Sequence, residues 1–213
     1  METVLKDINP VLQMLVVMTI FSLIPLIFCC MTSFLRFVIV FSMLKTAMGT
    51  QQVPPSIVII GLAMILTFYT MGGTFQKMYE LGSIPYQRDK NIVETINEGS
   101  KPLKEFMLKQ TREGDLAFFV ELSKGRAPNS PDELTVWQIA PAFIVSELKT
   151  SFEIGFIIFV PFIVLDLVVA NILLALGMFM LSPTIISLPF KLLIFIAVDG
   201  WALIVQGLVT SYN

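Results

Sequence analysis

The chain has 213 residues, of which 55% are hydrophobic and 14% charged, with a mean hydropathy of +0.81 and a net charge of −2. This composition is too apolar for an ordinary soluble domain, in which about a quarter of the residues are charged, and the small net charge does not indicate a nucleic-acid surface. The chain has no histidine, which excludes Ser-His-Asp and Cys-His catalysis and histidine-ligated zinc.

The charged residues gather in the middle of the chain. The segment from Lys77 to Lys149 holds 21 of the 30. We therefore predict an all-α integral membrane protein with a soluble helical insert. Its three parts are an N-terminal hydrophobic helical hairpin over 1–74, a polar helical insert over 75–150 and a C-terminal hydrophobic helical hairpin over 151–213.

The first hydrophobic part begins with two apolar runs. Val11 to Met31 is long enough to cross a hydrocarbon core of about 30 Å, and Pro25 is expected to kink it. We expect this run to insert directly, because no basic region or small-residue cleavage site accompanies it. Phe37 to Lys45 reads as a second helix that is apolar on most sides, which favours burial against protein.

A turn at Gly49 to Pro55 separates these helices from the next run, Ile57 to Thr74, which is predicted to end at Gly72 and Gly73. The link before the turn carries Arg36 and Lys45 and no acidic residue. By the positive-inside rule this link faces the cytoplasm, and the polar insert then lies on the opposite, periplasmic side.

Apolar residues within the insert recur every three to four positions between 92 and 122, which predicts helices. Gly125 to Asp132 is predicted to be a loop, and Pro131 to open a helix. Trp137 to Leu148 reads as an amphipathic helix that leads into the third membrane-type run.

The C-terminal part carries ionisable residues inside apolar runs. Phe152 to Leu181 contains Glu153 and Asp166, and Leu188 to Val209 contains Lys191 and Asp199. An ionisable group in hydrocarbon costs several kcal/mol unless it is paired or faces a wet interior. The pattern therefore favours helices packed inside a larger assembly.

Lys191 needs a partner from outside its own helix. Asp199 lies eight residues further on, about 12 Å along a helix and too far for contact. We predict an ion pair between Glu147 and Lys191 of neighbouring copies, with Asp166 as the second choice of partner for Lys191. The other buried polar residues are predicted to be Arg36, Asp166 and Asp199, although a cytoplasmic anchor is an alternative role for Arg36.

An uncharged link joins the last two apolar runs, and it contains Met178, Phe179 and Met180. One interpretation makes these three residues ordinary core residues at a helix end. The other makes them a deformable seal, because methionine is unbranched and flexible and an apolar ring resists ions by dewetting.

Four motifs, taken together, resemble the FliP/SctR family of export-gate subunits from flagellar and virulence type III secretion systems. They are MTSFLR at 31–36, AMGTQQVPP at 47–55, PAFIVSEL at 141–148 and PFKLLIFIAVDGW at 189–201. They follow one another in order over nearly the whole chain.

The resemblance implies a non-enzymatic pore subunit without a cofactor. Five copies would assemble with SctS/FliQ-like and SctT/FliR-like subunits into a helical cone, next to an SctU/FlhB-like switch protein. Unfolded polypeptide substrates would pass through this cone at the bacterial inner membrane, and the assembled complex would lie partly in the periplasm. In the family a methionine-rich loop forms a gasket, which maps to Met178, Phe179 and Met180, with Phe179 in place of a third methionine.

Two further questions concern the branch and the class of function. The lack of a leader, together with residues 171–177 and 207–212, favours the injectisome branch over the flagellar branch, although residues 109–112 and 146–150 suit both. A secondary transporter or ion channel using Asp166, Asn171, Lys191 and Asp199 is the alternative class, but the sequence contains no internal repeat. The sequence lacks the credible aspartate pair that an intramembrane protease would need. It also contains no phosphate-binding loop of the kind that an ATPase uses.

Overall fold

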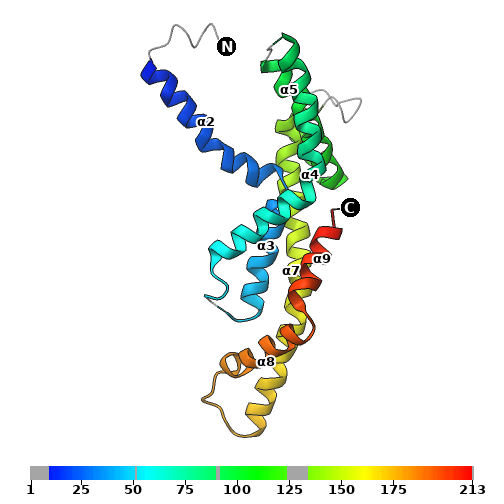
Figure 1. Cartoon of the computed structure of the whole chain (residues 1–213). Helices are drawn as coiled ribbons and strands as arrows, with labels where there is room; N and C mark the ends of the chain where they lie inside the picture. Colours follow the sequence, from blue (N-terminus) through cyan, green and yellow to red (C-terminus); the bar gives the residue numbers. More distant parts are fainter. Residues whose placement is uncertain (1–9, 51, 90–91, 124–133, 213) are drawn as a thin grey trace.

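A computed structural model describes residues 10–50, 52–89, 92–123 and 134–212. These residues form helices and contain no strand, which confirms the predicted all-α class. In chain order the helices are α2 (Pro10–Met31), α3 (Phe34–Ala47), α4 (Ser56–Asp89), α5 (Ile92–Gln110), α6 (Glu113–Leu122), α7 (Val136–Ala175), α8 (Pro183–Ala197) and α9 (Gly200–Thr210). Figure 1 shows an elongated molecule in which the other helices, apart from α2, are arranged along α7.

Helix α7 is the spine of the fold. Its 40 residues extend over about 60 Å, roughly twice the thickness of a hydrocarbon core. A capping box at Thr135 and Gln138 starts the helix, in which the Thr135 backbone N–H donates to Gln138 Oε1 at 3.0 Å. The helix start predicted at Pro131 and the predicted loop lie outside the described residues. Helices α3, α5, α6 and α8 all pack against α7.

The sequence predicted that helix α4 ends at Gly72 and Gly73, and this prediction is wrong. The helix continues to Asp89 over 34 residues. A glycine inside a helix costs only about 1 kcal/mol, and the buried side chains of Thr67 and Met71 hold this stretch against the rest of the chain. The proposed boundaries after residues 74 and 150 both fall inside continuous helices, α4 and α7. The division into three parts stays a prediction.

The predicted burial of the second helix is confirmed in α3. Phe37, Val40, Phe41 and Leu44 are buried almost completely. They pack against α4, α7 and the C-terminal helices. Each such side chain contributes about 1.5–3 kcal/mol through burial, which fixes the position of α3 on the spine.

The last apolar run was predicted to be one helix, but it forms two. Helices α8 and α9 meet at 63°, and Asp199 between them adopts a left-handed conformation with φ of 52°. A Cβ atom at Gly200 would lie 2.3 Å from the Phe195 ring. The bend therefore depends on the close approach that glycine permits.

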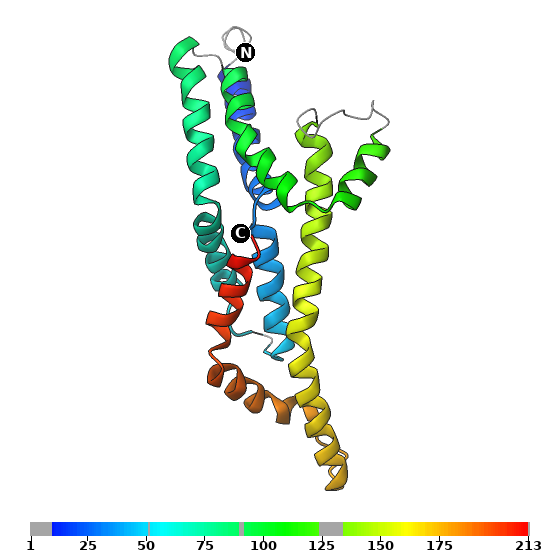
Figure 2. The same cartoon turned by 90° about the vertical axis from the view of Figure 1, so that its right-hand side faces the viewer.

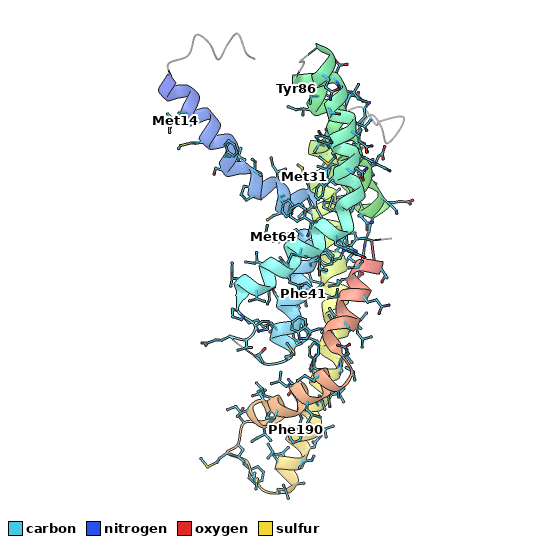
Figure 3. The ribbon with its side chains drawn as sticks, in the orientation of Figure 1. Met14, Met31, Phe41, Met64, Tyr86 and Phe190 are labelled. Atoms are coloured by element: carbon cyan, nitrogen blue, oxygen red, sulfur yellow. The ribbon has the colours of Figure 1, made fainter. Side chains whose placement is uncertain are left out.

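Long apolar faces remain uncovered in the single chain. Ser56–Gln87 and Gln138–Ala175 are long and apolar enough to cross a membrane, and counting each of two bent helix pairs as one span raises the number to four. Helix α2 extends away from the other helices in Figure 1, and Figure 3 shows its Met14 side chain pointing into open space. Pro25 lies inside this helix without ending it. The length and apolarity of these helices indicate a membrane protein.

Candidate functional site

The loop between α7 and α8 is held by backbone contacts at both ends. Gly177, with φ of +72°, ends α7, and the backbone N–H groups of Gly177 and Met178 donate to Leu174 and Leu173. These two bonds form a Schellman motif, which glycine favours because it adopts positive φ without steric cost. Helix α8 then starts at Pro183, whose missing N–H needs no partner at this position.

The tip of this loop presents the three residues of the predicted gasket. Phe179 is 76% exposed and Met180 is 100% exposed, and Met178 is also exposed. Figures 1 and 2 show the loop at the end of the molecule, beyond every other helix. No other part of the described chain packs over this apolar tip, so the loop does not belong to a helix-end core within one chain.

A second feature is a buried ion pair that joins α3 to α7. Arg36 is 3% exposed and Glu147 is 0% exposed. Arg36 Nε donates to Glu147 Oε2 at 2.8 Å, and its Nη2 also donates to Glu147 Oε1. Both carboxylate oxygens are therefore bonded to one guanidinium, which is the bidentate geometry that arginine favours.

The C-terminal end of the chain completes this cluster. Tyr212 donates its hydroxyl to Glu147 Oε2 at 2.7 Å, and the Arg36 guanidinium lies 3.8 Å above the Tyr212 ring. Arg36 Nη1 also donates to Ser211 Oγ at 2.8 Å. Burial, together with the negative charge of Glu147, raises the pKa of Tyr212 well above its usual value, so the phenol stays a hydrogen-bond donor.

A third feature is a second ion pair, which joins α7 to α8. Lys191 is 4% exposed, and its Nζ donates to Asp166 Oδ2 at 2.7 Å and to the Ala47 carbonyl at 3.3 Å. Ser187 Oγ donates to the other carboxylate oxygen of Asp166. Lys191 thus connects the end of α3 to both α7 and α8.

The structure places Glu147 and Lys191 in separate clusters. Glu147 pairs with Arg36, and Lys191 pairs with Asp166, the second choice from sequence. The expected pair between copies stays a prediction, but both charges already have a partner in the same chain. Arg36 is buried and ion-paired rather than a free cytoplasmic anchor, which leaves Lys45 as the unburied charge of the link.

Asp199 was expected to be buried, but it is exposed at the junction between α8 and α9. Sequence reasoning also missed Tyr212 as a partner of Glu147. The signal available was weak: a tyrosine after the last apolar run is more often an interfacial residue than a buried donor.

A polar contact on the part of α7 next to Glu147 holds α6. Asp115 is buried and accepts hydrogen bonds from Ser146 at 2.8 Å and from Lys149. Arg112 donates to Glu153 at 2.5 Å and to Thr150 at 3.2 Å. The hydrogen bond from Lys149, and next the one from Ser146, hold the pKa of Asp115 below its ordinary value of 3.8.

The docking of α6 is expected to weaken in acid. A carboxylate with a lowered pKa stabilises the fold above its ordinary pKa, and this contribution disappears as the pH falls through the lowered value. The contribution of Asp115 should therefore be complete above about pH 5 and fall away below its ordinary value of 3.8. Thermal unfolding of the wild type and Asp115→Asn checks this. Their Tm difference should shrink between neutral and strongly acidic pH, and a constant difference would contradict the assignment.

The described residues contain no group of three His, Cys, Asp or Glu side chains placed to hold a metal ion. The candidate site is therefore the exposed apolar loop, positioned by helices that the two ion pairs connect.

The sequence comparisons identify the group to which this chain is related. The FliP family model matches residues 17–208, most of the chain. The chain belongs to the FliP family. This confirms the resemblance carried by the four motifs.

Relatives come from more than one kind of system. The flagellar biosynthetic protein FliP of Bacillus subtilis is 44% identical over 97% of this chain and 94% of its own length. The Yop proteins translocation protein R of Yersinia pestis is 41% identical over 95% of this chain and 96% of its own length. FliP of Buchnera aphidicola subsp. Acyrthosiphon pisum is 46% identical over 94% of this chain, and this chain spans about half (53%) of that relative's length.

Proposed function

We propose that this chain is a pore-forming subunit of a type III secretion export gate, which conducts unfolded polypeptides across the bacterial inner membrane. Membership of the FliP family supports the system. The observation that carries the pore role is the loop tip, where Met180 is fully exposed beyond the last helical turn. Exposing such an apolar tip to water does not stabilise a soluble monomer. A ring of these tips would form a closed apolar constriction.

The proposed assembly follows from the same surfaces. Several copies, five by family resemblance, would join SctS/FliQ-like and SctT/FliR-like subunits, with an SctU/FlhB-like switch protein next to them. The polar insert would face the periplasm. The exposed apolar faces of α4 and α7 support subunit or lipid contacts. The gate would have no enzymatic activity of its own.

The branch of the system is a finer part of this proposal. Identity to the flagellar relatives is 44% in Bacillus subtilis and 47% in Caulobacter vibrioides, compared with 41% to the Yersinia pestis relative. These values favour a flagellar system, and the sequence-based preference for an injectisome gains no support from them. The pore proposal is the same for both branches.

Opening the constriction is the direct test of the gasket. Replacing Met178, Phe179 and Met180 together by glycine should raise the ion conductance of the assembled gate by about an order of magnitude, because the apolar barrier to water is lost. Conductance of membranes containing the gate, and secretion in cells, are the measurements.

The matched control is a double alanine variant at Phe118 and Leu122, which are exposed on α6 in the polar insert and lie outside the apolar faces of α4 and α7. This control should leave conductance unchanged. If the loop variant assembles normally and its conductance equals that of the wild type, the gasket proposal is wrong.

A further inference from the structure

A cavity of about 670 Å³ lies between the end of α3, the middle of α7 and the start of α8. Its polar wall includes Lys45, Thr50, Asp166 and Lys191, and its apolar wall includes Ile163 and Leu188. The volume is in the range of small-molecule sites. The exposed loop tip lies outside this cavity, so the proposed gasket does not use it.

The charges around this cavity do not balance. Lys191 and Asp166 neutralise each other at 2.7 Å. Lys45 also lines the cavity. It is half-buried in the last turn of α3. No carboxylate in the described part of the chain forms an ion pair with it. The cavity therefore carries one uncompensated positive charge.

The place of the cavity in the fold restricts what can fill it. Lys45 lies at the end of one bent apolar helix pair, and α8 begins the other. Ends of membrane-type helices lie at the level of the lipid headgroups, where anionic lipids attract basic side chains. The hydroxyls of Thr46 and Thr50 donate to backbone carbonyls, whereas the ammonium of Lys45 is available as a donor to a ligand.

We infer that this cavity binds the headgroup of an acidic phospholipid. The phosphate accepts hydrogen bonds from Lys45, which supplies the single opposite charge. The first carbons of the acyl chains lie against Ile163 and Leu188. A zwitterionic lipid brings a second, positive group close to Lys45 and Lys191, and a free phosphate ion makes no use of the apolar wall. This inference concerns one chain and is independent of the proposed pore.

Chemical labelling of lysines tests the inference on the full chain. The chain is placed in phosphatidylcholine nanodiscs, with or without phosphatidylglycerol, and acylation of each lysine is measured by mass spectrometry. Phosphatidylglycerol should slow the labelling of Lys45 about fivefold relative to Lys101, an exposed lysine of the polar insert. Inorganic phosphate added to phosphatidylcholine nanodiscs should leave Lys45 labelling unchanged.

Lipid retention gives a second measurement. Phosphatidylglycerol that stays bound after transfer to detergent is counted by native mass spectrometry. Lys45→Gln should retain about fivefold less than the wild type, Lys45→Arg should retain as much, and the control Lys101→Gln should be unchanged.

Four results would overturn the inference. The first two are that phosphatidylcholine alone slows the acylation of Lys45 as much as phosphatidylglycerol does, and that inorganic phosphate slows it. The third is that Lys45→Gln retains as much phosphatidylglycerol as the wild type. The fourth is that Lys45 is already unreactive without acidic lipid. The last result would mean that a second copy of the chain covers the cavity. None of them bears on the conductance of the loop variant, so the two proposals fail separately.

Discussion

Replacing Arg36 by alanine is expected to lower the free energy of unfolding by about 3–5 kcal/mol. Glu147 is 0% exposed, and both of its oxygens are bonded by Arg36. Without the guanidinium, a carboxylate stays buried with only the Tyr212 hydroxyl as a partner. Thermal or denaturant unfolding of the chain in detergent measures this loss.

Removing both charges together should cost less than removing Arg36 alone. The double variant Arg36→Met with Glu147→Leu keeps the volume of the site and leaves no unpaired charge, and such replacements of buried pairs are often nearly neutral. A double-mutant cycle gives the coupling energy between the two residues. If the two single losses simply add, the ion pair does not act as a unit in the folded chain.

Replacing Asp166 by alanine is the second large effect, a loss of about 3 kcal/mol. Lys191 is almost completely buried, and without Asp166 its ammonium keeps only the Ala47 carbonyl, at 3.3 Å. The end of α3 and the start of α8 would then separate. Faster hydrogen exchange in α8 than in α9 would report this local loss.

The opposite replacement is expected to be milder. Lys191→Met leaves Asp166, whose side chain is 28% exposed and can be hydrated, so we expect a loss of about 1 kcal/mol. Both variants break the same ion pair, but Asp166 is less buried than Lys191 and keeps the Ser187 hydroxyl as a donor. An equal loss in both variants would show that the cavity does not admit water to Asp166.

Charge reversals separate the pair inside the chain from the pair proposed between copies. Lys191→Asp with Asp166→Lys should restore the stability of the single chain. Lys191→Glu with Glu147→Lys should restore ring assembly only if these two residues meet across neighbouring copies. Glu147 and Lys191 are both buried in the single chain, so that contact requires each side chain to leave its present partner.

Several features of this protein follow from its sequence because they depend on composition and short-range pattern. The all-α class and the turn before α4 need only local apolarity, helical spacing, glycine and proline. The apolar loop tip after Leu176 was also predictable, because Gly177 and Pro183 bracket a stretch without charge. The four motifs then sufficed to indicate the family.

The tertiary structure decided the partners and the continuity of the helices. Arg36 meets Glu147 across 111 positions of sequence, and no local pattern distinguishes Glu147 from Asp166 as its partner. Gly72 and Gly73 stay helical because α4 is held by packing on α3 and α5, whereas the last run bends where Gly200 lets the Phe195 ring approach. Side-chain pairing and helix bending depend on contacts between distant segments, and these form only when the chain packs around α7.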